Sequence, residues 1–280
     1  YPSRLIEVDL PIARISAHAA RARRKRQGNI ASLHLWWARR PSAACRAVTL
    51  AALLPDPCDV RCPVAFLETA KKSVVQWSTS FGSDVDSATF ERLTKLRRTP
   101  SLADDPAFLR GALLDFVAEF SSPDNAAIPA YLRIARELVD AAHRSLLGVA
   151  DARPIVLDPF AGGGAFPLEF SRLGTDAVAS DLNPVAVLLN KVLIEYVPRF
   201  GDALVSAVRD AGEQMKRRAA ERLSRFYPTG KDGALPIAYF WARTARCEGP
   251  SCGVLIPLLG RQQITKRRQP PVAVFLKQAR

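Results

Sequence analysis

The sequence predicts an α/β fold, in which helices pack on both faces of a parallel sheet and a helical module precedes the sheet. Three observations support this prediction. Residues 155–157, Ile-Val-Leu, have the apolar character of a short buried strand, and a glycine-rich turn follows them. A second strand is expected at 177–180. Helical segments follow the two strands at about 166–173 and 184–194, and this alternation is the start of a doubly wound parallel sheet.

Three helices are predicted upstream of this sheet. Residues 43–54 have an apolar body that begins just after one proline and stops before another. Residues 106–120 begin with a proline that follows two aspartates, which is a typical helix start. Residues 126–147 carry apolar side chains at helical spacing, and Gly148 stands where a helix commonly ends.

Changes of pattern divide the rest of the chain. Residues 78–89, STSFGSDVDSAT, are rich in Ser, Thr and Asp and predict a loop or short connector. Residues 201–226 predict a long basic helix, and turns, a cysteine pair and a basic tail follow Tyr227. We therefore expect four segments, namely a basic helical N-terminal module at 1–54, a helical connector at 55–150, the glycine-loop part of the sheet at 151–240, and a cysteine-containing segment with a basic tail at 241–280.

The composition favours a polyanionic partner. Lys and Arg number 40 against 27 Asp and Glu, which gives a net charge of +13, and such an excess is typical of proteins that bind nucleic acid. The charge is clustered, since residues 21–26 read RARRKR. We expect phosphate contacts from Arg23, Arg24, Lys25 and Arg26, while a solvated helix face explains the same run equally well.

Two absences in the sequence bear on its location. No apolar run approaches the roughly 18 residues that a membrane-spanning helix needs, and the first ten residues lack the basic-then-apolar order of a signal peptide. We therefore expect a cytoplasmic protein. Its five cysteines are an odd number, which argues against a disulfide framework.

The strongest chemical signal is the segment DPFAGGG at 158–164, which follows the first strand and opens a helix. Glycines there allow a sharp turn and let a ligand approach the backbone closely. Asp181 ends the second strand, 23 residues after Asp158. An acid near that spacing hydrogen-bonds the ribose hydroxyls of a nucleotide in such folds. The pattern therefore predicts a nucleotide-binding loop, whereas the glycines alone would indicate a tight turn.

The residues around the glycines narrow the class of nucleotide. A phosphate-binding loop would carry Lys and then Ser or Thr, and a dinucleotide loop would read G-x-G-x-x-G, but the run here is G-G-G-A-F-P. The carboxylate of Asp158 would repel a pyrophosphate, because like charges repel. It suits a cationic ligand such as S-adenosylmethionine, whose ammonium group it could bind.

Two motifs, DPFAGGG at 158–164 and SDLNPVAV at 180–187, resemble motifs I and II of the DNA amino-methyltransferases. The segments LHLWWARRP at 33–41 and AYFWARTARCEGPSCG at 238–253 resemble a family of adenine-specific DNA methylases that contain a zinc ribbon and begin with a domain of unknown function, DUF1156. The resemblance covers most of residues 4–259. It implies an α/β, Rossmann-like class I S-adenosylmethionine-dependent methyltransferase fold, incomplete here, with a helical N-terminal module.

This resemblance also implies a cofactor and a substrate, namely S-adenosylmethionine and an adenine in DNA. The residues that it implies for cofactor binding are Asp158, Phe160, Ala161, Gly162, Gly164, Asp181 and Asn183. The loop residues would line the methionine side of the cofactor, and the last two would line its adenosine side.

The sequence departs from this family at the acceptor site. Such enzymes carry Asp, Asn or Ser, then Pro-Pro and an aromatic residue, which hold the exocyclic amine of a flipped base. Residues 269–272 have both prolines, but Gln replaces the short polar residue and Val replaces the aromatic one. We therefore expect no catalytic residue in this chain, a truncated family member whose C-terminal portion is missing or separately encoded, and no methyl transfer by the chain alone.

Cys247 and Cys252 resemble half of a zinc ribbon, whose complete site needs four ligands. No Cys or His follows Cys252, and Cys58 and Cys62 belong to a different predicted segment. The sequence therefore favours two free thiols over a filled zinc site.

The segment LHLWWARRP has two interpretations. Arg39 or Arg40 could pair with the cofactor carboxylate or with a DNA phosphate. Trp36 and Trp37 could stack on a base, or both could fill the core beside the cofactor pocket.

Two rival functions fit parts of the sequence. A non-enzymatic nucleic-acid-binding remnant would explain why the acceptor motif is missing. An RNA or protein methyltransferase would share the glycine loop and differ in substrate.

Overall fold

The structure is a computed structural model that describes residues 1–24, 33–38, 40–80, 85–148, 153–227 and 242–259. The chain forms two compact units, Tyr1–Ala207 and Val208–Arg280, and each is described by itself. The four-segment division that the sequence suggests remains a prediction.

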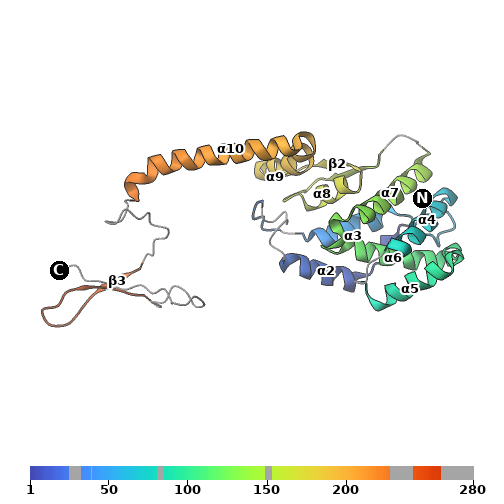
Figure 1. Cartoon of the computed structure of the whole chain (residues 1–280), viewed down its shortest axis with the longest axis horizontal. Helices are drawn as coiled ribbons and strands as arrows, with labels where there is room; N and C mark the ends of the chain where they lie inside the picture. The colour runs from blue at the N-terminus through green and yellow to red at the C-terminus, as the bar shows by residue number, and fades with distance from the viewer. Residues whose placement is uncertain (25–32, 39, 81–84, 149–152, 228–241, 260–280) are drawn as a thin grey trace. The chain divides into compact units, whose positions relative to one another are not determined.

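Helices build the N-terminal part of the first unit (Figure 1). The α-helices are α1 (Leu5–Val8), α2 (Ile12–Arg24), α3 (Ser42–Leu53), α4 (Val64–Ser80), α5 (Ser87–Arg98), α6 (Pro106–Ser121) and α7 (Pro129–Leu147). Two short 3₁₀ turns, η2 (Pro100–Asp104) and η3 (Asn125–Ala127), precede α6 and α7. The helices predicted at 43–54 and 106–120 are confirmed, and the one predicted at 126–147 begins three residues later, at Pro129.

The predicted start and stop signals act as expected in α6 and α7. The carboxylate of Asp105 accepts hydrogen bonds from the amides of Ala107 and Phe108, which otherwise have no partner at a helix start. Gly148 follows α7 with a φ of 66°, a left-handed conformation that glycine adopts without strain.

The prediction of a loop or connector over 78–89 is wrong at both ends. Helix α4 continues to Ser80, and α5 begins at Ser87; residues 81–84 lie outside the described part. The polar residues that suggested a loop mark helix ends instead. The carboxylate of Asp86 accepts from the amides of Ala88 and Thr89 and so caps α5, while the hydroxyl of Ser78 donates to the carbonyl of Val75 within α4.

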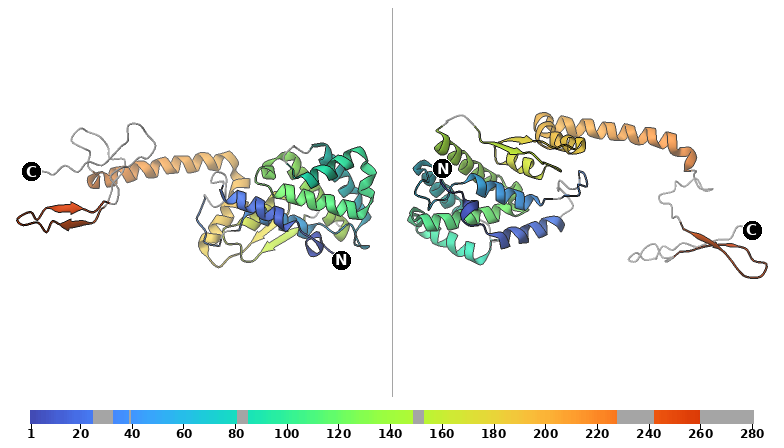
Figure 2. Two further views of the ribbon diagram at one scale, coloured as in Figure 1. Left: turned by 90° about the horizontal axis from the view of Figure 1, so that it is seen from below. Right: turned by 180° about the vertical axis from the view of Figure 1, so that it is seen from behind.

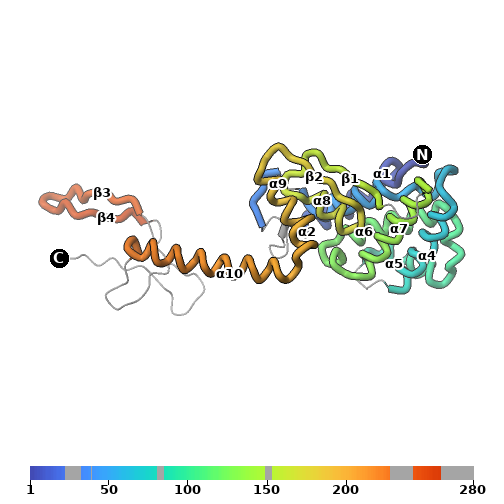
Figure 3. Tube along the Cα trace, turned by 90° about the horizontal axis from the view of Figure 1, so that it is seen from above, coloured from blue at the N-terminus to red at the C-terminus, as the bar shows by residue number. Residues whose placement is uncertain are grey.

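The core of the first unit is helical and aromatic. Trp77 of α4 meets Phe116 of α6 edge to face, with ring centroids 5.2 Å apart, and both side chains are almost fully buried. Tyr131 of α7 stacks on Phe116 at 5.7 Å, so these rings join three helices. Figure 3 shows α4, α5, α6 and α7 gathered in one body.

Charged and polar contacts attach α2 to α6. The guanidinium of Arg14 lies 2.6 Å from Asp115 and 2.8 Å from Glu119. Nδ1 of His18 lies 3.0 Å from the hydroxyl of Ser121. These contacts hold α2 against α6.

The α/β part begins with β1 (Ile155–Asp158) and β2 (Asp176–Ala179), which pair in parallel. Helix α8 (Ala165–Arg172) connects them and packs against both strands (Figure 2). The two predicted strands and the crossover helix are thereby confirmed. On the other face of the sheet Ile155, Leu157 and Val178 are exposed.

The Rossmann-like arrangement expected from the resemblance is not confirmed. Within the described residues the parallel sheet has two strands and α8 packs on it, while the rest of the first unit is mostly helical. The packing of helices on both faces of a larger parallel sheet stays a prediction.

Helix α9 (Pro184–Asn190) follows β2 and continues through a π-helical turn, η4 (Lys191–Tyr196), into α10 (Val197–Leu223) and the 3₁₀ turn η5 (Ser224–Phe226). The helices predicted at 184–194 and 201–226 are therefore present, but α10 starts before Gly201. Gly201 interrupts the helical geometry with a φ of 49° and a ψ of −130°. No residue of α10 is buried.

The described strands of the second unit form a hairpin of β3 (Thr244–Arg246) and β4 (Leu255–Pro257), antiparallel with Ala245 opposite Ile256. The sequence predicted turns here, and the structure adds this short ladder. Among the described helices, none is both long and apolar enough to cross a membrane.

Candidate functional site

The glycine loop joins the carboxyl end of β1 to the first turn of α8. Gly162 and Gly164 have positive φ values of 49° and 80°, which an L-residue adopts only with strain. The carboxylate of Asp158, the last residue of β1, accepts a hydrogen bond of 3.1 Å from the amide of Phe160. The loop therefore turns sharply directly after Asp158, as the sequence predicted.

Asp181 meets this loop from the end of β2. Its Oδ2 accepts a 2.8 Å hydrogen bond from the amide of Gly162, and its Oδ1 accepts one of 2.8 Å from the amide of Asn183. Hydrogen bonds from Asn183 and Gly162 to the charged carboxylate lower the pKa of Asp181 below its ordinary value. The side chain of Asn183 accepts from the amide of Val185 and caps α9.

Asn190, which the sequence did not point to, binds the carbonyl of the glycine whose amide Asp181 binds. Its side-chain amide donates to the carbonyl of Gly162 over 3.1 Å and to the carbonyl of Ala186 over 2.8 Å. Its Oδ1 would lie 3.0 Å from a β-carbon added at Gly164. A polar residue within the apolar run of α9 was the available signal.

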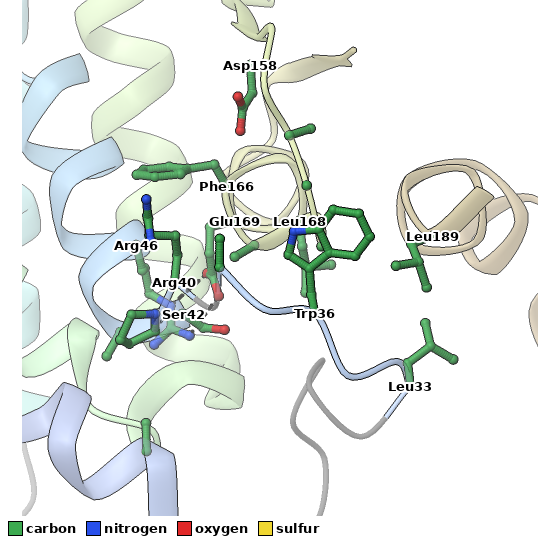
Figure 4. Close-up of a pocket in the computed structure, with 18 of the residues that line it drawn as sticks. Leu33, Trp36, Arg40, Ser42, Arg46, Asp158, Phe166, Leu168, Glu169 and Leu189 are labelled. Atoms are coloured by element: carbon green, nitrogen blue, oxygen red, sulfur yellow. Dashed lines mark hydrogen bonds and ion pairs between the residues drawn. The ribbon is translucent and has the colours of Figure 1, made fainter. Parts of the chain in front are cut away.

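A cavity of about 840 Å³ opens beside the loop (Figure 4). Five of the predicted cofactor residues line it, namely Asp158, Phe160, Ala161, Gly162 and Asp181. Gly164 and Asn183 are outside this lining and act on the shape of the loop and on the start of α9. The cavity thus gathers the two acids and most of the glycine loop.

The N-terminal region forms another wall of the cavity. Lining residues from this region include Leu33, Trp36, Trp37, Arg40, Ser42 and Arg46. Trp36 packs on the loop itself, because a β-carbon added at Gly162 would lie 2.9 Å from its Nε1 and one at Gly163 would lie 3.3 Å from its Cβ. Trp36 is half-buried and lines the cavity beside the loop, whereas Trp37 is 86% exposed, so the interpretation that both tryptophans fill the core is wrong for Trp37. Stacking of either ring on a base stays a prediction.

Arg46 and Glu169 are two further lining residues that the sequence analysis missed. Their side chains form an ion pair and are 3% and 1% exposed. Figure 4 shows them beside Arg40 at the cavity. No local pattern signalled this pair, since its members stand 123 positions apart.

The predicted nucleic-acid residues are partly outside the described chain. Lys25, Arg26 and Arg39 lie outside the described residues. For Arg23 and Arg24 the structure describes the backbone, which ends α2. Arg40 is exposed and lines the cavity, which places it near the glycine loop. The DNA contacts of the basic run stay a prediction.

Cys247 and Cys252 face each other across the turn of the β3–β4 hairpin. The amide of Cys252 donates to the carbonyl of Gly249 over 3.0 Å, and the amide of Cys247 donates to that of Val254 over 2.8 Å. Hydrogen bonds from the Val254 amide and the Cys247 side chain lower the pKa of Cys252. Two thiols do not complete a zinc site, and the described residues contain no cluster of three or more metal-ligating side chains.

A parallel βα unit with a glycine loop and an acid after the second strand is an arrangement typical of α/β nucleotide-binding sites. Comparison with protein families gives this class a more specific description. Residues 133–226 match the model of the D12 class N6 adenine-specific DNA methyltransferases, and residues 9–76 match that of a protein of unknown function, DUF1156. No curated protein and no solved structure matches the chain. Residues 133–226 are therefore similar to a class of DNA adenine methyltransferases that uses S-adenosylmethionine as a family trait, and residues 9–76 are similar to DUF1156.

Proposed function

We propose that this chain binds S-adenosylmethionine in the cavity beside the glycine loop, as the cofactor-binding half of a DNA adenine N6-methyltransferase. The observation that carries the proposal is the pair of carboxylates at the ends of the parallel strands. Asp158 is the last residue of β1, Asp181 lies just after the end of β2, and both line the cavity. Residues 133–226, which include them, match the D12 class model.

The residues present fit this cofactor in size and in charge. The cavity of about 840 Å³ lies in the range of roughly 300–1,000 Å³ that small-molecule sites occupy. The carboxylate of Asp158 would accept a charge-assisted hydrogen bond from the ammonium group. Arg40, on the N-terminal wall, would pair with the carboxylate of the methionine moiety.

The adenosine half has matching groups. Each carboxylate oxygen has two lone pairs, so Asp181 can accept ribose hydroxyls while it holds the amides of Gly162 and Asn183. Asn183 would contribute to adenosine binding indirectly, because its side chain caps the start of α9. Phe160 and Trp37 are each 86% exposed at the cavity and offer aromatic surface to the adenine ring.

When bound, the cofactor supplies a methyl group that its sulfonium already activates. The residues of this chain bind and orient it. Holding the amine of a target adenine takes a further segment, and the 280 residues contain no Asp, Asn or Ser followed by Pro-Pro and an aromatic residue. We therefore assign cofactor binding to this chain and no catalytic residue to the transfer.

Calorimetry with S-adenosylhomocysteine tests the proposal. We expect one binding site, and we expect Asp158→Asn and Arg40→Gln each to weaken affinity by about tenfold. Asp176→Asn is the matched control, because Asp176 begins β2 at an exposed position outside the cavity lining. A folded chain that does not bind, or a control as weak as Asp158→Asn, would refute the site.

The same protein should not methylate DNA by itself. A transfer assay with a labelled methyl group on mixed-sequence DNA is expected to give background incorporation. Incorporation that Asp158→Ala abolishes would refute the assignment of a cofactor-binding half. DNA binding without S-adenosylhomocysteine binding would instead support the nucleic-acid-binding remnant, and label on RNA or protein would support the other rival.

A further inference from the structure

We infer that the ion pair between Arg46 and Glu169 is a positioning pair that makes the N-terminal region, matched as DUF1156, an integral part of the cofactor site. The inference rests on the proposed function and goes beyond it, because it gives the N-terminal region a role. Arg46 lies in α3, within the matched residues 9–76, and Glu169 lies in the helix that follows the glycine loop.

The geometry of the pair is bidentate. Nε of Arg46 donates to Oε2 of Glu169 over 2.8 Å, and Nη2 donates to Oε1 over 3.0 Å. Two parallel hydrogen bonds fix the planes of the guanidinium and the carboxylate as well as their distance. Helix α8 is thereby held to α3 in one orientation.

The same guanidinium also holds the end of α6. Nη1 of Arg46 donates to the carbonyl of Phe120 over 2.9 Å, and the guanidinium carbon lies 5.3 Å from the centre of the Phe120 ring. The last carbonyls of a helix lack partners within the helix and attract a cation. One side chain therefore joins α3, α6 and α8.

The burial of the pair argues for a positional role. Arg46 is 3% exposed and Glu169 is 1% exposed, and withdrawing two charges from water costs much of what their attraction returns. A packed apolar pair could stabilise the fold as well. An ion pair demands a defined geometry in addition, and this one lies in the wall of the cavity.

The pair also lies on the two elements that carry the contact between Trp36 and the loop. Ser42, the first residue of α3, follows Trp36 by six positions, so the placement of α3 limits where the indole can reach. The indole packs on Gly162 and Gly163, which precede α8. Arg46 and Glu169 therefore join the helix that follows the tryptophan, α3, to the helix that follows the loop, α8.

The test compares this pair with another ion pair of the same unit, in which the acid is buried and the arginine is 29% exposed. Arg110 donates from Nε to Asp56 over 2.7 Å, Asp56 is 3% exposed, and neither residue lines the cavity. Arg46→Gln, Glu169→Gln and Arg110→Gln are compared by melting temperature, by S-adenosylhomocysteine affinity well below that temperature, and by hydrogen exchange of peptides from the ligand-free glycine loop. Arg46→Lys keeps the positive charge and replaces Arg46→Gln in these measurements if Arg46→Gln does not fold.

We expect Arg46→Gln and Glu169→Gln to weaken affinity by about tenfold or more and to speed exchange of the loop. Arg110→Gln should lower the melting temperature comparably while affinity stays within about twofold of the unmodified chain. Equal effects of all three variants on affinity and exchange, or none from the first two, would overturn the inference. An unmodified chain that fails to bind refutes the proposed function alone, because loop exchange still tests the positioning role.

Discussion

The carboxylate of Asp181 accepts a hydrogen bond of 2.8 Å from the amide of Gly162, so the acid after the second strand holds the glycine loop after the first. This contact gives Asp181 a structural task beside the ribose contact proposed for it. With Asn190 bonded to the carbonyl of the same glycine, both polar groups of Gly162 are fixed from the β2–α9 side. The loop is therefore preorganised before any ligand arrives.

The two tasks of Asp181 predict a graded mutational effect. Asp181→Ala removes the acceptor for the amides of Gly162 and Asn183, and S-adenosylhomocysteine affinity should fall by about tenfold or more. Asp181→Asn keeps one acceptor oxygen and should lose less. Calorimetry measures both, and unchanged affinity in Asp181→Ala would remove Asp181 from the site.

Gly164 should not tolerate a side chain. It has a φ of 80°, and an added β-carbon would lie 2.9 Å from Cδ1 of Leu193. Gly148→Ala is the control, because Gly148 has a φ of 66° but no atom within 4 Å of an added β-carbon. The left-handed conformation alone costs about 1–2 kcal/mol, so Gly148→Ala should lose that amount and Gly164→Ala more. Equal losses in denaturant unfolding would show that the contact with Leu193 does not matter.

The parts of the site that the sequence predicted are those that local chemistry determines. Asp158, the glycine turn and Asp181 lie at or just after strand ends, where the carboxyl edge of a parallel pair brings them together. Asn190, Arg46 and Glu169 act through contacts between distant segments, and such contacts leave no periodic signal. The sequence left open whether Trp36 stacks on a base or fills the core beside the pocket, and its contact with Gly162 required the tertiary structure.

The fold shows the same division between local and distant information. Helices with clear caps, such as α6 after Asp105 and α7 before Gly148, were predicted within a few residues. The stretch 78–89 was interpreted as a loop because its polar residues outweigh its apolar ones, yet Trp77 and Leu93 on either side are buried and hold α4 and α5 in the core. Burial against other helices overrides weak local propensity.

His18 predicts a pH dependence of stability. Burial, with the charge of Arg21 as the next cause, lowers its pKa below the ordinary value of 6.5. The unfolded chain then binds the proton first, so stability is full above about pH 6.5 and is lost as pH falls through the folded-state pKa. Denaturant unfolding between about pH 5 and 8 should show a decline that His18→Gln flattens and Arg21→Gln reduces. A decline that persists unchanged in His18→Gln would exclude this histidine as its source.

The cysteines should differ strongly in reactivity. Cys252 is exposed and its pKa is lowered by hydrogen bonds from the Val254 amide and Cys247, whereas burial raises the pKa of Cys45 to about 12. The thiolate is the nucleophile, so iodoacetamide near neutral pH should modify Cys252 first and Cys45 last. Mass spectrometry of timed digests measures the order. Early modification of Cys45 in the folded chain would contradict its burial on α3.

The measurement that tests the central claim most directly is photochemical cross-linking of methyl-labelled S-adenosylmethionine, followed by peptide mapping. We predict saturable labelling, competed by S-adenosylhomocysteine, on peptides that contain Trp36 and Trp37 or the loop with Phe160, because these aromatic residues line the cavity. Arg46→Gln should reduce the label and Arg110→Gln should not. Competed labelling that maps to the second unit, or labelling that S-adenosylhomocysteine does not compete, would contradict a cofactor site between the glycine loop and the N-terminal region.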